Sequence, residues 1–96
     1  MEPAEGWPST WRWIAGTEEA TLLEDQLYRE MLVGHPLHRL APIAIARCDG
    51  SDDVLFKASD DRVAEVHLTW GERHPDYPTT VFRTTLNDWA TAQVEE

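Results

Sequence analysis

The sequence predicts an α+β fold in which an amphipathic helix packs on a four-stranded antiparallel meander and a short helix follows the last strand. Three observations support this prediction. One segment carries apolar residues at helical spacing, four later segments alternate with a period of two, and a capping pattern precedes a final apolar stripe. With 96 residues, the chain fits one domain spanning residues 1–96.

The first sixteen residues form a Trp-rich arm. Trp7, Trp11 and Trp13 lie close together in it, with Pro8 among them and Gly16 at the end. Proline and glycine disfavour a long helix, so the pattern indicates an extended segment in which Trp11 and Trp13 share one face. We expect these rings to cover the core as a lid; a partner-binding patch is the alternative.

Residues 18–33 have the period of an amphipathic helix. Ala20, Leu23, Leu27 and Met31 recur every three or four residues. Thr17 is the expected N-cap, and Gly34 followed by Pro36 is a stop signal. Leu22 and Val33 lie on the opposite side of the helical wheel, where they are either partly exposed or covered by the arm.

The strands are predicted at residues 40–48, 53–58, 62–70 and 79–84, with Asp-rich turns at 49–53 and 59–62. Pro42 suggests that the first of them starts at a sheet edge, where Ile43 and Ile45 share one face and Ala44 and Ala46 the other. In the third strand, strict alternation assigns one face to the core and the other to solvent. The core face holds Ala64, Val66, Leu68 and Trp70, and the solvated face holds Glu65, His67 and Thr69. Thr85 and Asp88 have the spacing of a capping pair for the C-terminal helix. The predicted core contains Leu23, Leu27, Met31, Phe56, Val66, Leu68 and Trp89.

Composition excludes several classes of function. A net charge of −10 disfavours direct binding to nucleic acid and to anionic membranes, because both depend on neutralisation by Lys and Arg. The longest mostly apolar run, residues 40–46, is far below the ~20 residues that cross a bilayer. Cys48 is the only cysteine, and the acidic start lacks the positive charge of a signal peptide, so we expect a cytoplasmic protein.

No catalytic motif and no cofactor signature is found in the sequence. His35 and His38 are separated by Pro36, which indicates a turn with locally bonded or solvated imidazoles, and no metal site is predicted. The candidate binding residues lie on the polar face of the third strand and in the loop after it. They are His67, Trp70, Arg73, His74, Asp76 and Tyr77. A rigid connector is an equally good interpretation of the loop.

Three segments carry a resemblance to known proteins: Gly34-His35-Pro36-Leu37, Asp52 to Phe56, and Val66 to Trp70. Together they resemble a group of small bacterial α+β proteins that have one helix followed by strands. The resemblance covers about residues 20–90 and leaves out the Trp-rich arm. It implies the fold and no activity.

The function predicted from these features is a small acidic protein-interaction module, an inhibitor or immunity-type partner of a basic protein. Acidic surfaces steer association with basic partners, and aromatic rings supply binding energy. The alternative is a small-ligand binder or enzyme that uses the polar sheet face and the loop at 70–78, with Glu65 beside His67 as a further candidate group. Mimicry of nucleic acid ranks last, because the carboxylates are scattered along the chain.

Overall fold

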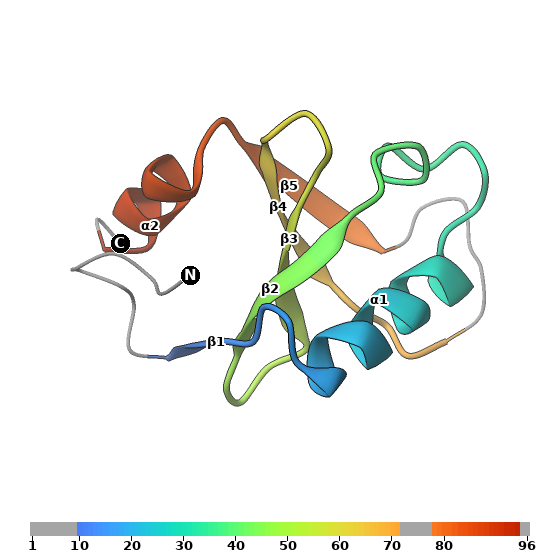
Figure 1. Cartoon of the computed structure of the whole chain (residues 1–96), viewed down its shortest axis with the longest axis horizontal. Coiled ribbons are helices and arrows are strands. Elements are labelled where there is room, and N and C mark those ends of the chain that lie inside the picture. The colour runs from blue at the N-terminus through green and yellow to red at the C-terminus, as the bar shows by residue number, and fades with distance from the viewer. Residues whose placement is uncertain (1–9, 72–77, 95–96) are drawn as a thin grey trace.

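The computed structural model describes residues 10–71 and 78–94. Within these residues, five strands form one antiparallel sheet and two helices pack against it (Figure 1). The elements are β1 (Trp11–Trp13), α1 (Glu18–Glu30), β2 (Ile43–Cys48), β3 (Asp53–Lys57), β4 (Val63–His67), β5 (Thr79–Arg83) and α2 (Leu86–Val94). The strands lie in sequence order and each neighbouring pair is antiparallel. The predicted α+β class and the meander are confirmed.

The sheet has one strand more than predicted. Part of the Trp-rich arm forms β1, which pairs with β2 so that Trp11 lies opposite Cys48 and Trp13 opposite Ala46. A strand of three residues is too short for its period to be measured in the sequence. The arm is therefore docked on the sheet from residue 10 onward, whereas residues 1–9 lie outside the described part of the chain.

Helix α1 is shorter than predicted at its C-terminal end. Thr17 caps it as expected, its hydroxyl accepting a hydrogen bond from the Ala20 N–H at 3.2 Å. At the other end Met31 is already extended, with ψ at 135°. The helix thus stops three residues before the predicted boundary at Val33, and both Leu22 and Val33 are exposed.

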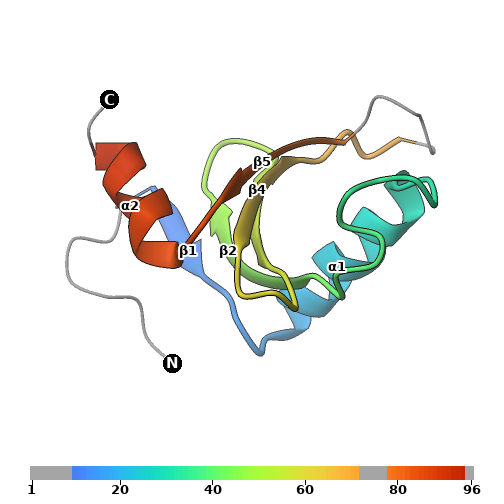
Figure 2. The same cartoon turned by 90° about the horizontal axis from the view of Figure 1, so that it is seen from above.

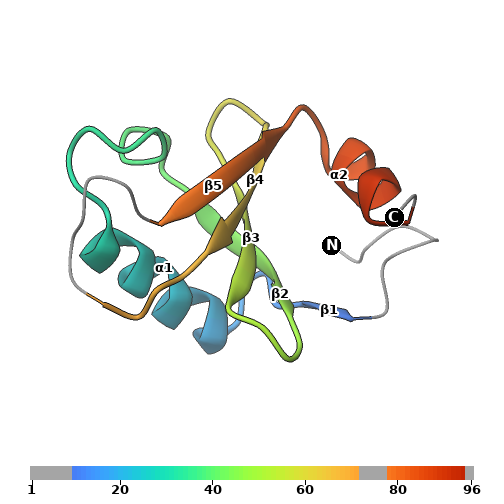
Figure 3. The ribbon, with the colours of Figure 1, turned by 180° about the vertical axis from the view of Figure 1, so that it is seen from behind.

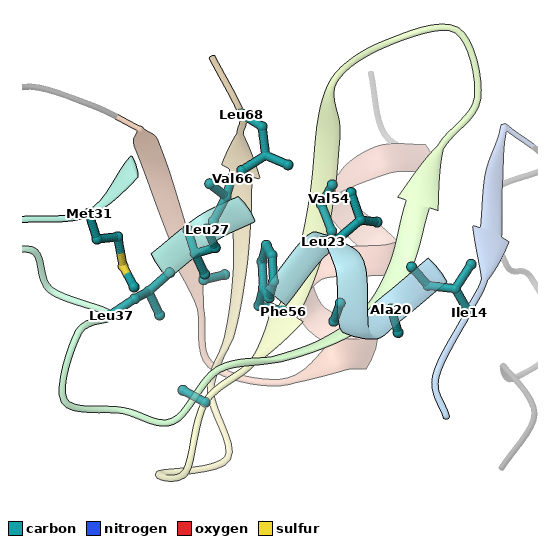
Figure 4. Close-up of a cluster of buried hydrophobic side chains, with 13 residues drawn as sticks. Ile14, Ala20, Leu23, Leu27, Met31, Leu37, Val54, Phe56, Val66 and Leu68 are labelled. Atoms are coloured by element: carbon teal, nitrogen blue, oxygen red, sulfur yellow. The ribbon is translucent and has the colours of Figure 1, made fainter. Parts of the chain in front are cut away.

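The main core lies between α1 and the concave face of the sheet, which curves around this helix (Figure 2). Figure 4 shows Leu23 and Leu27 of α1 facing Val54, Phe56 and Val66 of the strands. All seven residues predicted for the core are buried: Leu23, Leu27, Met31, Phe56, Val66, Leu68 and Trp89. Burial of such side chains contributes roughly 1.5–3 kcal/mol each.

The opposite face of the sheet is not simply solvated, in contrast to the prediction. Helix α2 lies at the same end of the sheet as β1 (Figure 3), and its Trp89 ring meets Trp11 edge to face with 4.8 Å between centroids. These two rings pack with Ile45, Leu55 and Val63 into a second buried cluster. Trp11 and Trp13 thus cover this face of the sheet as the lid prediction expected, whereas Trp7 lies outside the described residues.

A β-bulge explains why β2 departs from strict alternation. The pairing of β2 with β3 shifts between Ala44 and Ala46. As a result Ala44 faces the main core while Ile45 and Ala46 both join the second cluster. The prediction that Pro42 marks an edge strand is wrong, because β2 lies between β1 and β3.

Candidate functional site

Trp70 is half exposed, with 49% of its surface accessible, although alternation had assigned it to the core. The β4 ladder ends at His67, and Trp70 has a positive φ of 59°. A bulky residue at positive φ is strained, and such residues collect at binding sites. The predicted core position of Trp70 is therefore wrong. Its exposed ring is available for contact with a partner, so Trp70 stays among the candidate binding residues.

A buried carboxylate fixes the backbone at Trp70. Glu30, at the end of α1, is only 1% exposed, and its Oε1 accepts hydrogen bonds from the N–H and the hydroxyl of Thr69, both at 2.7 Å. Its Oε2 accepts from the Trp70 N–H at 3.0 Å and from the Gln26 amide at 2.8 Å. A buried carboxylate needs such partners. Glu30 thereby holds the chain in the conformation that turns the indole outward.

The indole itself is held by the turn between β2 and β3. Trp70 Nε1 donates a hydrogen bond to Oδ1 of Asp52 at 3.0 Å, and the Asp52 carbonyl accepts from the Leu68 N–H at 3.0 Å. Among the described residues Asp52 forms no ion pair with a cationic side chain. One carboxylate thus sits at the edge of an exposed aromatic ring whose backbone and ring N–H are both fixed.

His67 is exposed, as predicted, and pairs across the strands with the residue after Asp52. Its Nδ1 lies 2.9 Å from Oδ1 of Asp53, its partner across the strands. A carboxylate only accepts, so Nδ1 carries the proton. Ser51 donates to the other oxygen of Asp53 at 3.0 Å. The predicted neighbour of His67, Glu65, accepts a hydrogen bond from Trp89 Nε1 at 2.8 Å.

A network of ion pairs supports the other side of the same turn. Arg12 donates to Glu19 at 3.0 Å and to Asp49 at 2.7 Å, and Arg47 donates to Glu19 at 2.9 Å. The hydrogen bonds from Arg12 and then Arg47 hold the pKa of Glu19 below its usual range. This network ties β1, α1 and β2 together at the base of the acidic turn.

The remaining predicted site residues, Arg73, His74, Asp76 and Tyr77, lie outside the described residues. Among the described residues, one hollow lies beside residues 49–52 and has Asp52 in its lining, another lies between β1 and α2, and another lies beside the turn at 33–40. Neither His67 nor Trp70 lines any of them. In the described part of the chain, His, Cys, Asp and Glu side chains do not gather in threes that could hold a metal ion.

Sequence reasoning had missed Asp52, Asp53 and Glu30 as members of this site. One signal was available for Glu30, because residue 30 lies on the apolar stripe of Leu23 and Leu27, where a polar side chain needs a buried partner. Asp52 and Asp53 could not be found in this way, because their contacts with Trp70 and His67 depend on the pairing of β3 with β4.

Comparison of the chain with family models, with curated proteins and with solved structures gave no match. In the described residues no helix has the length and apolar character needed to span a bilayer. Any functional conclusion therefore depends on the chemistry of the site.

Proposed function

We propose that this chain is a cytoplasmic protein-interaction module that binds a basic segment of a partner protein through Trp70 and Asp52. The single observation that supports the proposal is the half-exposed Trp70 indole, whose N–H is bound by a carboxylate that forms no ion pair with any described residue. Tryptophan is enriched among the residues that dominate binding energy. An inhibitor or immunity-type partner of a basic protein has this chemistry.

The pair suits an arginine or lysine side chain. Asp52 supplies the opposite charge, and the face of the indole attracts a cation through its quadrupole. Because Glu30 fixes the backbone and Asp52 fixes the ring, little side-chain entropy is lost when a partner binds. The net charge of −10 adds long-range attraction for a basic partner and raises the rate of encounter.

The alternative of an enzyme or small-ligand binder centred on His67 has less support. Nδ1 of His67 is occupied by Asp53, and Ser51 bonds the far oxygen of that carboxylate instead of approaching the imidazole. The order of these groups is therefore not that of a nucleophile with its base. No observation favours this alternative over protein binding.

Affinity capture from the native lysate tests the proposal. The baits are the intact protein, Trp70→Ala and Leu22→Ala, the last being a matched loss of an exposed apolar side chain on α1. We expect a partner that is retained by the intact protein and by Leu22→Ala, is lost with Trp70→Ala and is weakened by moderate salt. Failure to retain any specific protein at low or moderate salt, or equal retention by all three baits, would contradict the proposal.

A further inference from the structure

A hollow of about 470 Å³ lies beside the turn that joins α1 to β2. It is lined by Val33, Gly34, His35, Pro36, Arg39, Leu40 and Arg62. Its ionisable side chains are two guanidinium groups and an imidazole, and among the described residues no carboxylate lines it. In a chain of net charge −10, such a local reversal of sign favours an anionic ligand.

Arg62 is held in a fixed orientation at one side of the hollow. Its Nε donates to Oδ2 of Asp60 at 2.8 Å, and its guanidinium carbon lies 4.4 Å from the ring centroid of Phe82. Within the described residues its two terminal nitrogens form no hydrogen bond. A guanidinium fixed in this way presents the donor edge that binds a carboxylate or a phosphate with two parallel hydrogen bonds.

Arg39 supplies a positive charge that, unlike that of Arg62, is not paired with any described carboxylate. It is exposed and forms no hydrogen bond or ion pair with any described residue. In the hollow beside residues 49–52 both arginines, Arg12 and Arg47, are paired with carboxylates, whereas in this hollow only Arg62 has a described carboxylate partner, Asp60. The hollow beside the α1–β2 turn is therefore the better anion site of the two.

The rest of the lining is apolar or rigid. Val33, Pro36 and Leu40 provide apolar walls. Nδ1 of His35 accepts the Leu37 N–H at 3.1 Å, so Nε2 carries the proton and donates to the Pro78 carbonyl at 3.0 Å. The imidazole thus ties the turn to the start of β5 and fixes the shape of the hollow.

We infer that this hollow binds a small organic oxyanion, a carboxylate or a phosphate monoester on an apolar or aromatic body. Arg62 forms the two-pronged contact, Arg39 adds charge, and Val33 and Leu40 pack against the body of the ligand. Arg62 directly precedes β4 and Trp70 follows it, so the hollow and the proposed partner site lie at opposite ends of this strand. The inference goes beyond the proposed function and does not depend on it.

Nuclear magnetic resonance titration tests the inference with four matched probes: benzoate, phenyl phosphate, benzylamine and benzyl alcohol. We expect benzoate and phenyl phosphate to shift the amide signals of residues 33–40 and 59–62, with dissociation constants of about 10 mM or below. Benzylamine and benzyl alcohol lack the negative charge and should shift them little. Equal shifts with benzylamine, or no shift with either anion, would overturn the inference.

Charge-matched variants separate a defined site from a general charge effect. Arg39→Gln and Arg62→Gln should each weaken benzoate about tenfold. Arg83→Gln removes the same charge from β5, at a residue that shares a face with Val63 and not with Phe82. Arg83→Gln should therefore leave benzoate binding unchanged. Equal weakening by Arg39→Gln, Arg62→Gln and Arg83→Gln would refute the site. Arg62→Lys keeps the positive charge but cannot form two parallel hydrogen bonds, so it should also weaken benzoate binding. If Arg62→Gln does not fold, Arg62→Lys and Arg39→Gln together test the site.

Discussion

The carboxylate of Glu30 and the backbone N–H of Thr69 form a 2.7 Å hydrogen bond that joins the end of α1 to the segment after β4. The same carboxylate also accepts the Thr69 hydroxyl and the Trp70 N–H. Because Glu30 is almost fully buried, its carboxylate depends on these hydrogen bonds in place of water. The orientation of the exposed indole thus depends on a residue inside the protein.

Replacement of Glu30 by Ala should destabilise the fold strongly. Four partly buried hydrogen bonds lose their charged acceptor, and each loss costs about 1–3 kcal/mol, so we expect about 3 kcal/mol or more in the free energy of unfolding. Glu30→Gln keeps one oxygen and should cost less. Urea unfolding measures both effects.

Asp25→Ala is the control, because Asp25 is an exposed carboxylate on the same helix. Its effect should stay within about 0.5 kcal/mol. A similar loss in Glu30→Ala and Asp25→Ala would mean that the buried hydrogen bonds add no stability beyond a general charge effect.

Glycine should be better tolerated than alanine at residue 70. The positive φ of Trp70 costs an L-residue roughly 1–2 kcal/mol that glycine avoids. The greater flexibility of glycine in the unfolded chain offsets part of this gain, so Trp70→Gly should exceed Trp70→Ala in stability by about 0.5–1 kcal/mol. Thermal and urea unfolding of the pair measure the difference.

The same pair of substitutions at Val33, which is exposed and does not have a positive φ, should give the opposite order. There alanine should be the more stable by about 0.5–1 kcal/mol. If alanine is also the more stable at residue 70, the backbone there is not strained.

The contact between Trp89 and Trp11 should be essential for the second cluster. Trp89→Ala removes a buried ring and should cost about 3–5 kcal/mol, whereas Trp89→Phe keeps most of the packing and loses the bond to Glu65. Near-ultraviolet circular dichroism reports the ring pair, and urea unfolding reports the stability. A loss below about 1 kcal/mol in Trp89→Ala would indicate that α2 is not docked on the sheet.

Stability should fall in acid partly through Glu19. Arg12 and Arg47 lower the pKa of Glu19 in the folded state. The stabilisation is then fully present above the ordinary glutamate pKa of about 4.3 and is lost as the pH falls through the lower folded value. Its size should be at most about 1 kcal/mol, because these groups are partly exposed.

Unfolding free energies of the intact protein and Glu19→Gln between pH 6 and pH 2.5 measure this contribution. The two curves should converge as the pH falls below about 4. Parallel curves over the whole range would show that the Glu19 network does not contribute.

The periodic elements were predictable from the sequence because their apolar residues are spaced by the geometry of helices and strands. Leu23 and Leu27 of α1 and Val66 of β4 lie where the period placed them. Trp70 was misplaced because alternation was extended beyond His67, where the ladder ends and Glu30 binds the backbone instead. Strand pairing also decides that Asp53 meets His67, and no local pattern reveals it.

The second face of the sheet was misjudged for a related reason. The alternation in the sequence predicts that Glu65 is solvated. In the structure it accepts a hydrogen bond from the indole N–H of Trp89, which lies on a helix that starts about twenty residues later. Likewise the bulge at Ala44 depends on tertiary contacts, since the Ala44 N–H is bound by Glu24 of α1 at 3.0 Å. Short-range patterns cannot encode such contacts between distant segments.

The affinity of the captured partner for the intact protein and for its variants, measured by isothermal titration calorimetry, tests the central claim most directly. Trp70→Ala should weaken binding about 30-fold, which corresponds to about 2 kcal/mol. Asp52→Asn should weaken binding and reduce its salt dependence, because it removes the charge that faces the basic segment. Leu22→Ala should bind as the intact protein does. Equal affinities for the intact protein, Trp70→Ala and Asp52→Asn would contradict the claim that Trp70 and Asp52 form the partner-binding site.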